Sequence, residues 1–317
     1  MSTVISSPHP PAHVRVAGAA LAALGGVALA VQGRINGQLG HLIHDGVFAA
    51  LISFGTGTIL LVAAVSSTPS ARAGLRRLRS SVRGGRLRVW QCLGGACGAF
   101  LVTTQGLTVS ILGVAVFTVA VVAGQVVASL VVDRQGVGPG GPQPVTPPRA
   151  VGALLAVVAV VIAVSDHGAI EDAGGLWWAL LPAVAGLGLA WQLAVNGLVR
   201  VAADHVVVPT LVNFSVGTIV LLLAAAVDAL VRGLPAALPG DWWLYVGGPL
   251  GIVTVLTAVS AVRFTGVLLL GLSSVAGQLL GAVLLDLVVP TTGGLTVAGA
   301  VGTALTMVAV GIAAIRR

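Results

Sequence analysis

Ten apolar stretches, each long enough to cross a lipid bilayer, constrain this chain more than any other feature. A helix that spans the hydrocarbon core needs about 20 largely apolar residues. Such stretches run near residues 15–36, 47–65, 90–108, 111–132, 148–164, 176–198, 206–227, 243–262, 266–285 and 294–314. Because the bilayer interior offers no water to exposed amides, stretches of this kind fold as helices. We therefore predict an all-α integral membrane protein with ten transmembrane helices.

The composition supports this class. Hydrophobic residues make up 57% of the chain and charged residues 8%, with a mean hydropathy of +1.06, whereas a soluble domain has about 25% charged residues. A net charge of +7 would suggest nucleic acid in a soluble chain. Here the arginines flank the apolar stretches, so we expect no nucleic-acid partner. Cys92 and Cys97 lie on different sides of a helix, and we expect no disulfide between them.

The distribution of arginine predicts the orientation. The longest connection, 66–89, has no acidic residue and contains Arg72, Arg76, Arg77, Arg79, Arg83, Arg86 and Arg88. The positive-inside rule places it in the cytoplasm. With that choice only Arg34 and Arg232 fall outside, and Asp166, Glu171 and Asp172 lie in an outer loop. Both termini are then cytoplasmic, and residues 1–13 are expected to be a disordered tail.

The chain also contains an internal repeat. Gln32, Asn36 and Phe54 return 160 positions later as Gln192, Asn196 and Phe214. Further on, Ala123-Gly124-Gln125 returns as Ala276-Gly277-Gln278, at a displacement of 153. Five helices per unit is an odd number, so the second copy must enter the membrane from the opposite side. We predict two inverted five-helix repeats, 14–165 and 176–317, an arrangement typical of secondary transporters.

Paired amides are the main candidates for a site. Gln32 and Asn36 lie four apart and share one helix face, as do Gln192 and Asn196. They could bond across helices and hold them together, each bond contributing about 1 kcal/mol. Alternatively, they line a central cavity between the repeats. The sequence leaves both interpretations open.

Gln125 and Gln278 are the strongest cavity candidates, because each stands in mid-helix after a glycine that permits close backbone approach. Asn213, its repeat mate Ser53, and Gln105 form a second rank. Thr103, Thr104 and Thr257 are also considered, although bonding to their own helix backbone explains them more simply.

Several kinds of chemistry are not supported. No acidic residue lies near a helix centre, since Asp133, Asp228 and Asp286 stand at helix ends, so a buried-carboxylate proton antiport is not expected. Arg34 and Arg263 could hold an anionic group, though interfacial anchoring is the simpler role. There is no Walker A, HExxH or GxSxG motif, and the histidines lie in tails or loops. We expect neither an enzyme nor a bound metal or cofactor.

The run Gln32-Gly33-Arg34-Ile35-Asn36-Gly37-Gln38-Leu39-Gly40, followed by Ser53-Phe54-x-x-Gly57-Thr58, resembles the YdcZ-like family (domain of unknown function 606). That family is a branch of the drug/metabolite transporter superfamily, which includes the EamA-like proteins. Its members are five-helix units used singly or fused in tandem, and this chain resembles the fused form. The resemblance implies a ten-helix bundle that exports small molecules. The second copy departs from the motif, with Leu193-Ala194 in place of Gly33-Arg34.

The predicted function is secondary-active transport or export of small metabolites or drugs across the bacterial inner membrane, by alternating access. The substrate would be neutral or amphiphilic and held by amides and hydroxyls, in a monomer or homodimer. Two alternatives remain. One is a lipid-carrier flippase that uses Arg34 and Arg263 for a headgroup, and the other is a non-transporting membrane scaffold.

Cysteine labelling tests the orientation. In a variant with Cys92 and Cys97 replaced by Ser, we expect Ser80→Cys in loop 66–89 to react with a membrane-impermeant maleimide only after the cells are permeabilised. Ala169→Cys, in the outer loop that contains Asp166, Glu171 and Asp172, should react in intact cells and serves as the control. Labelling of position 80 in intact cells would contradict the orientation.

Overall fold

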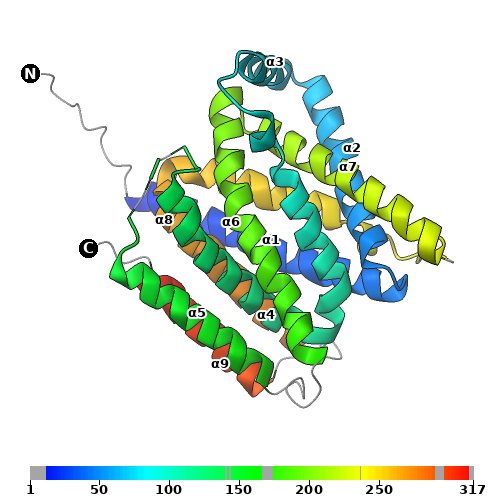
Figure 1. The fold of residues 1–317 in the computed structure, drawn as a ribbon, viewed down its shortest axis with the longest axis vertical. Coiled ribbons are helices and arrows are strands. Elements are labelled where there is room, and N and C mark those ends of the chain that lie inside the picture. The colour runs from blue at the N-terminus through cyan, green and yellow to red at the C-terminus, as the bar shows by residue number, and fades with distance from the viewer. Residues whose placement is uncertain are drawn as a thin grey trace, which may run out of the picture.

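A computed structural model describes residues 12–139, 141–142, 144–165, 174–235, 237–289 and 296–313, and every regular element in these ranges is helical. The predicted all-α class is therefore confirmed for the described residues. The predicted tail, 1–13, lies outside them apart from its last two residues. The elements, shown in Figure 1, are α1 (Ala12–Leu42), α2 (Gly46–Ser67), α3 (Pro69–Arg83), η1 (Val89–Cys92), α4 (Gly94–Gln135), α5 (Pro147–Ser165), α6 (Gly174–Ala203), α7 (Val207–Arg232), η2 (Trp242–Tyr245), α8 (Gly247–Val288) and α9 (Val297–Ala313).

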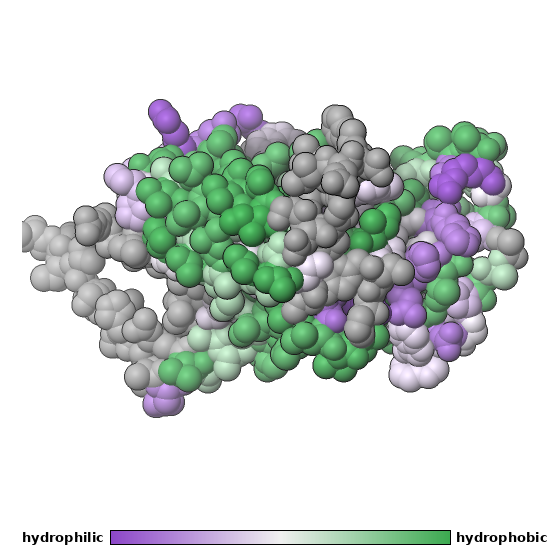
Figure 2. Space-filling model, turned by 90° about the horizontal axis from the view of Figure 1, so that it is seen from below, coloured by the Kyte–Doolittle hydropathy of each residue, from purple (hydrophilic) through white to green (hydrophobic). Residues whose placement is uncertain are grey.

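Within the described residues, a helix lies on each of the predicted apolar stretches. By length and composition, five described helical stretches are able to cross a membrane, and four shorter apolar helices accompany them. The stretches predicted at 90–108 and 111–132 join in α4, and those at 243–262 and 266–285 join in α8. Gly113, with φ 77° and ψ 161°, breaks α4 into a first arm before it and a second arm after it. Hydrophobic side chains cover much of the described surface in Figure 2, as expected of a surface that faces lipid.

The connection 66–89, which the sequence analysis treated as a loop, contains the helix α3. This helix begins at Pro69, where the missing N–H of proline is harmless. Its buried residues pack on the end of α6 and the start of α7, with Leu78 against Val199, Ala203 and Val208. The Arg77 guanidinium donates to the carbonyl oxygens of Ala203 at 3.0 Å and Asp204 at 3.1 Å, which caps the C-terminus of α6.

Extensive helix contacts join the two halves of the chain. Helix α1 packs on α8, α4 on α6, α5 on α9 and α2 on α7. The end of α2 lies at the α6–α7 turn, because Ser70 Oγ is 3.4 Å from His205 Nε2. The end of α7 lies at the α1–α2 turn, where Arg232 Nη2 donates to the His44 carbonyl at 3.1 Å. Helices α2 and α7 therefore run in opposite directions.

The α1–α2 turn is itself stabilised by a helix cap. The Asp45 carboxylate accepts from the backbone N–H groups of Val47 and Phe48, both at 2.9 Å, and so caps α2. Burial raises the pKa of Asp45, and the neighbouring Asp228 carboxyl raises it further, whereas the Phe48 N–H lowers it. The turn therefore places two carboxyl groups close together beside Arg232, which pairs with Asp228 at 3.5 Å.

Glycines at the helix crossings repeat in pairs. A β-carbon at Gly124 of α4 would overlap the Ala183 carbonyl of α6, and one at Gly277 of α8 would overlap the Ala23 carbonyl of α1. These two contacts are copies of each other in the internal repeat. The same holds for Gly95 against Asn213 and Gly248 against Ser53. Here helices touch backbone to backbone, a contact that only glycine allows and that lets helices associate in lipid.

Replacing one of these glycines tests the crossings. We expect Gly124→Ala to destabilise the protein by about 1–3 kcal/mol, because the added methyl group must displace a backbone carbonyl rather than a flexible side chain. The control is Gly55→Ala in α2, where a β-carbon meets nothing within 4 Å. Thermal unfolding in detergent measures both variants. An unfolding midpoint for Gly124→Ala equal to that of the control would contradict the close crossing.

Candidate functional site

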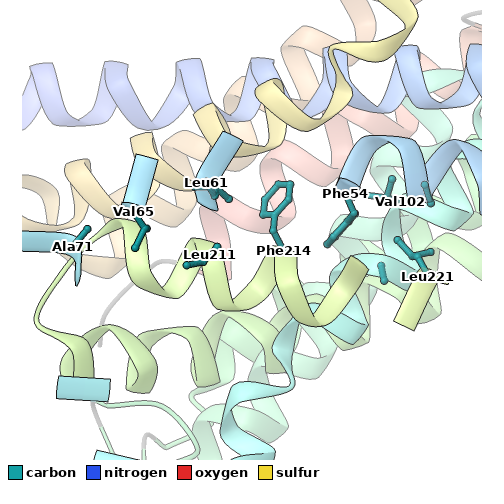
Figure 3. Packing of buried hydrophobic residues seen from close by; sticks show 10 residues of the cluster. Phe54, Leu61, Val65, Ala71, Val102, Leu211, Phe214 and Leu221 are labelled. Carbon is teal, nitrogen blue, oxygen red and sulfur yellow. The ribbon is translucent and has the colours of Figure 1, made fainter. Parts of the chain in front are cut away.

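Two residue pairs lie between α2 and α7 at equivalent positions of the repeat. The rings of Phe54 and Phe214 have centroids 4.9 Å apart (Figure 3), and the hydroxyl oxygens of Thr58 and Thr218 are 2.7 Å apart. A residue can touch its own repeat mate only where an axis relating the copies passes between them. Both contacts join residues that match in the sequence repeat, and Leu61, Leu211 and Leu221 pack in the same seam.

A glutamine from each half flanks the phenylalanine pair. Gln32 of α1 and the ring of Phe214 both lie against Gly251, where a β-carbon would come within 3.0 Å of each. Gln192 of α6 and the ring of Phe54 lie in the same way against Gly98. A β-carbon there would be 3.1 Å from Gln192 Oε1 and 3.2 Å from Phe54 Cζ. Both glutamines are buried, with 4% and 7% exposure. The predicted residues Gln32 and Gln192 are thus brought to opposite sides of one aromatic pair.

The two asparagines differ in their partners. Asn36 Nδ2 donates to Gln105 Oε1 at 2.8 Å, which links α1 to α4. Asn196 Nδ2 donates to Asn213 Oδ1 at 3.1 Å, which links α6 to α7. The repeat mate of Gln105 is Ala258, and that of Asn213 is Ser53. The two copies therefore keep the asparagine but satisfy it from different helices.

Three buried oxygen atoms of this region have no hydrogen-bond partner among the described residues: Asn36 Oδ1, Ser53 Oγ and Gln192 Oε1. Two of them, on Asn36 and Ser53, face Gly247 at the start of α8. An unsatisfied buried polar atom costs about 1–3 kcal/mol. We call Gln32, Asn36, Ser53, Gln105, Gln192, Asn196 and Asn213 the amide layer. Its members are partly bonded to one another and partly unpaired.

Gln125 and Gln278 are not members of the amide layer. Each follows the glycine of a close crossing, and their backbone nitrogens face Gly186 of α6 and Gly26 of α1. Gln278 is buried, at 5% exposure, and Gln125 is half-buried. The Ala-Gly-Gln triplets are therefore placed where α4 meets α6 and α8 meets α1, and a lining role for the two glutamines stays a prediction.

The threonines bond to their own helices, as the simpler interpretation expected. Thr103 Oγ1 donates to the Ala99 carbonyl at 2.9 Å, Thr104 to Leu101 at 2.7 Å, and Thr257 to Val253 at 2.8 Å. These hydroxyls are satisfied locally. The predicted absence of a disulfide is also confirmed, because Cys92 and Cys97 are free.

Asp286 is a buried residue whose role the sequence analysis missed. It stands near the end of α8, as predicted, but is only 2% exposed. Its carboxylate accepts from the backbone N–H groups of Val114, at 3.0 Å, and Ala115, at 2.7 Å. The break at Gly113 leaves these groups without carbonyl partners within the helix. Asp286 thus caps the second arm of α4 from another helix, and Arg34 of α1 is attracted to it electrostatically.

The repeat mate of Asp286 has a different partner. Asp133 forms an ion pair with Arg149 at the start of α5 and is more exposed, with 39% of its side chain accessible. The aspartate shared by the two copies was the signal that the sequence offered for this role. No local pattern in the sequence indicates that Asp286 contacts Val114. The side chain of Arg263, the other predicted anion-holding residue, lies outside the described part of the structure.

The chain matches a known protein family and is similar to a solved structure. The family model described as "Putative inner membrane exporter, YdcZ" matches twice, over residues 17–162 and 177–313. The two matches agree with the predicted repeats and with the tandem-fused form. A crystal structure of a protein with 20% sequence identity superposes with a TM-score of 0.53, covering 95% of this chain and 96% of the other, which indicates a shared fold. No curated protein matches the chain.

The family and the apolar helices together indicate a multi-pass protein of the inner membrane. The family is one of membrane exporters and not of enzymes, in agreement with the lack of catalytic motifs in the sequence.

Substitution of Asp286 tests the cap. We expect Asp286→Ala to destabilise the protein by about 2–4 kcal/mol, because two buried backbone N–H groups lose their acceptor. Asp286→Asn, which keeps one acceptor oxygen, should lose less. Thermal unfolding in detergent measures both, with the exposed Asp241→Ala as the control. If Asp286→Ala unfolds at the same temperature as the control, the carboxylate does not stabilise the break in α4.

Proposed function

The chain belongs to the YdcZ family, whose members are described as inner membrane exporters, and from that premise we propose that it is a secondary-active exporter of small molecules that works by alternating access. The observation that carries the proposal is the amide layer. A membrane protein buries unpaired polar atoms at a cost, and in membranes such atoms mark substrate pathways. Asn36 Oδ1, Ser53 Oγ and Gln192 Oε1 are unpaired and lie at contacts between the halves.

The chemistry of these atoms suggests the class of substrate. All three unpaired atoms are oxygens, which accept hydrogen bonds. The rings of Phe54 and Phe214 lie beside the two glutamines and offer apolar surface. A neutral or amphiphilic molecule with N–H or O–H donors and an apolar part would suit this combination. The amide layer contains no carboxylate and so offers no charged partner to a substrate. Its chemistry therefore suits a neutral group.

We further propose that the ten apolar stretches form two inverted five-helix repeats. Support comes from the opposite directions of α2 and α7, from the paired glycine crossings, and from the contacts of Phe54 and Thr58 with their own repeat mates. The concentration of arginine in the α2–α4 connection supports the same orientation.

The moving bodies in this proposal are helix groups that cross the boundary of the repeat. Helix α1 packs most extensively on α8, and α4 on α6, with glycine at both crossings, so each pair would move as a unit. Between the two units lie the Asn36–Gln105 bond and the Asp286 cap. Rocking of one unit against the other would open the amide layer to one side at a time. The Asp286 cap would act as a pivot.

The alternative of a lipid-carrier flippase needs a free cationic site for the headgroup. Arg34 was one of its two candidates, but its charge is attracted to Asp286. This attraction competes with a headgroup for the Arg34 charge, and the unpaired oxygens of the amide layer suit a neutral group, so we favour export of small molecules.

The proposal is tested on Gln192, because its side-chain oxygen is unpaired. Metabolites whose extracellular level depends on the protein are first identified by comparing expressing and non-expressing cells, and their flux is then measured in proteoliposomes. We expect Gln192→Leu to keep a wild-type unfolding temperature and to lose most of the flux. If Gln192 only held helices together, the substitution would instead lower stability and leave flux per folded molecule unchanged.

Two variants complete the design. Asn36→Leu breaks the bond to Gln105 and should lower the stability by about 1–3 kcal/mol, which calibrates the stability measurement. Its flux is not a control, because Asn36 also belongs to the amide layer. Gln135→Leu, an exposed glutamine at the end of α4, should change neither stability nor flux. Wild-type flux in the Gln192 variant would remove the amide layer as the site.

A further inference from the structure

We propose that α3 is a binding surface for anionic phospholipid headgroups in the leaflet that contacts the ends of α2 and α6. Helix α3 begins where the exposed apolar surface of α2 ends. Helix α2 exposes an apolar stripe that includes Ile59, Leu60 and Val62. This stripe gives way to the exposed polar residues Ser66 and Ser67, and α3 begins after Thr68. An apolar exposed stripe faces acyl chains, so its end marks the level of the headgroups.

One side of α3 is strongly basic and exposed. Arg72, Arg76, Arg79 and Arg83 are all exposed and lie within about 60° of one another around the helix axis. They lie on the side away from the buried residues Ala71, Gly74 and Leu78. Arg77, on the flank, is the arginine of this helix that caps α6. The connection 66–89 contains no Asp or Glu that could neutralise the other four.

Exposed apolar residues accompany this basic stripe. Leu75 on α3 is 39% exposed, and Val89 and Trp90 in η1, at the other end of the connection, are 67% and 41% exposed. Arg86 and Arg88 lie between them and are also exposed. Arginine combined with tryptophan and leucine is the composition of helices that lie in the membrane interface. A cluster of four to eight basic residues next to a spanning helix attracts anionic lipids.

The equivalent connection of the second copy is shorter and contains fewer arginines. The displacement between the copies drops from 160 before this connection to 153 after it, so the connection is longer than its counterpart between α7 and η2. By the same displacements the counterpart of 66–89 is 226–242, and its one arginine, Arg232, pairs with Asp228. The longer connection of the first copy instead brings six exposed arginines besides Arg77 to one side of the protein, the side where anionic lipid attracts them.

The test measures lipid binding by the purified full-length protein. Native mass spectrometry of the delipidated protein, titrated with phosphatidylglycerol or with phosphatidylcholine, gives the ratio of the two affinities. We expect the wild type to prefer phosphatidylglycerol, and the preference to fall when the ionic strength rises. Replacement of Arg72, Arg76, Arg79 and Arg83 together by Gln should weaken phosphatidylglycerol binding at least about tenfold.

A matched variant with Lys at the same four positions keeps the charge and should retain most of the binding. Equal phosphatidylglycerol affinity in the Gln variant and the wild type would overturn the proposal, as would equal loss in the Lys variant or equally tight binding of soluble glycerol 3-phosphate.

A second measurement needs no variant and applies even if the Gln variant fails to fold. Phosphatidylglycerol with a photoreactive headgroup, added to the wild type, should cross-link to peptides within 69–90. Cross-links confined to other segments would overturn the proposal. Neither readout depends on transport, so a failure here leaves the proposed export function untouched.

Discussion

Backbone-to-backbone contact at glycine is the interaction on which the rest of this structure depends. In lipid no hydrophobic force drives helices together, so they associate through close packing. Gly124 against Ala183 and Gly277 against Ala23 bring α4 onto α6 and α8 onto α1 without an intervening side chain. Because the contacts come in repeat-related pairs, the two halves interlock: the extensive pairings are α1 with α8 and α4 with α6, and not neighbours in sequence.

Once the helices are this close, the buried polar groups must find partners inside the protein. Asp286 does so at the break in α4, where Gly113 turns the chain and frees the N–H groups of Val114 and Ala115. The asparagines do so within the amide layer. Within the amide layer, the atoms that remain unpaired lie at contacts between the halves, near Gly247 and Gly98. Under the proposed function, hydrogen-bond donors of the substrate would satisfy these atoms.

The two copies of the repeat have diverged in their chemistry while keeping their geometry. The Phe54–Phe214 and Thr58–Thr218 pairs preserve the centre. Around it, Gln105 supports one asparagine and Asn213 the other, and Asp286 caps a helix break whereas Asp133 pairs with Arg149. The α3 connection is a further difference, and it concentrates basic charge on one side.

The sequence by itself determined the helical class, the positions of the apolar stretches, the repeat and the family. Hydrophobicity and length are local properties, and a bilayer leaves the backbone little choice but the helix. It also identified Gln32, Asn36 and Gln192 as polar residues that need an explanation. Only the tertiary structure decided their partners, because these depend on how each helix is rotated and where it crosses its neighbours. Asn36 and Gln105 are 69 positions apart, and Asp286 and Val114 are 172 apart. The same reason explains α3: its arginines were visible in the sequence, but its packing on the end of α6 depends on a contact between the two halves.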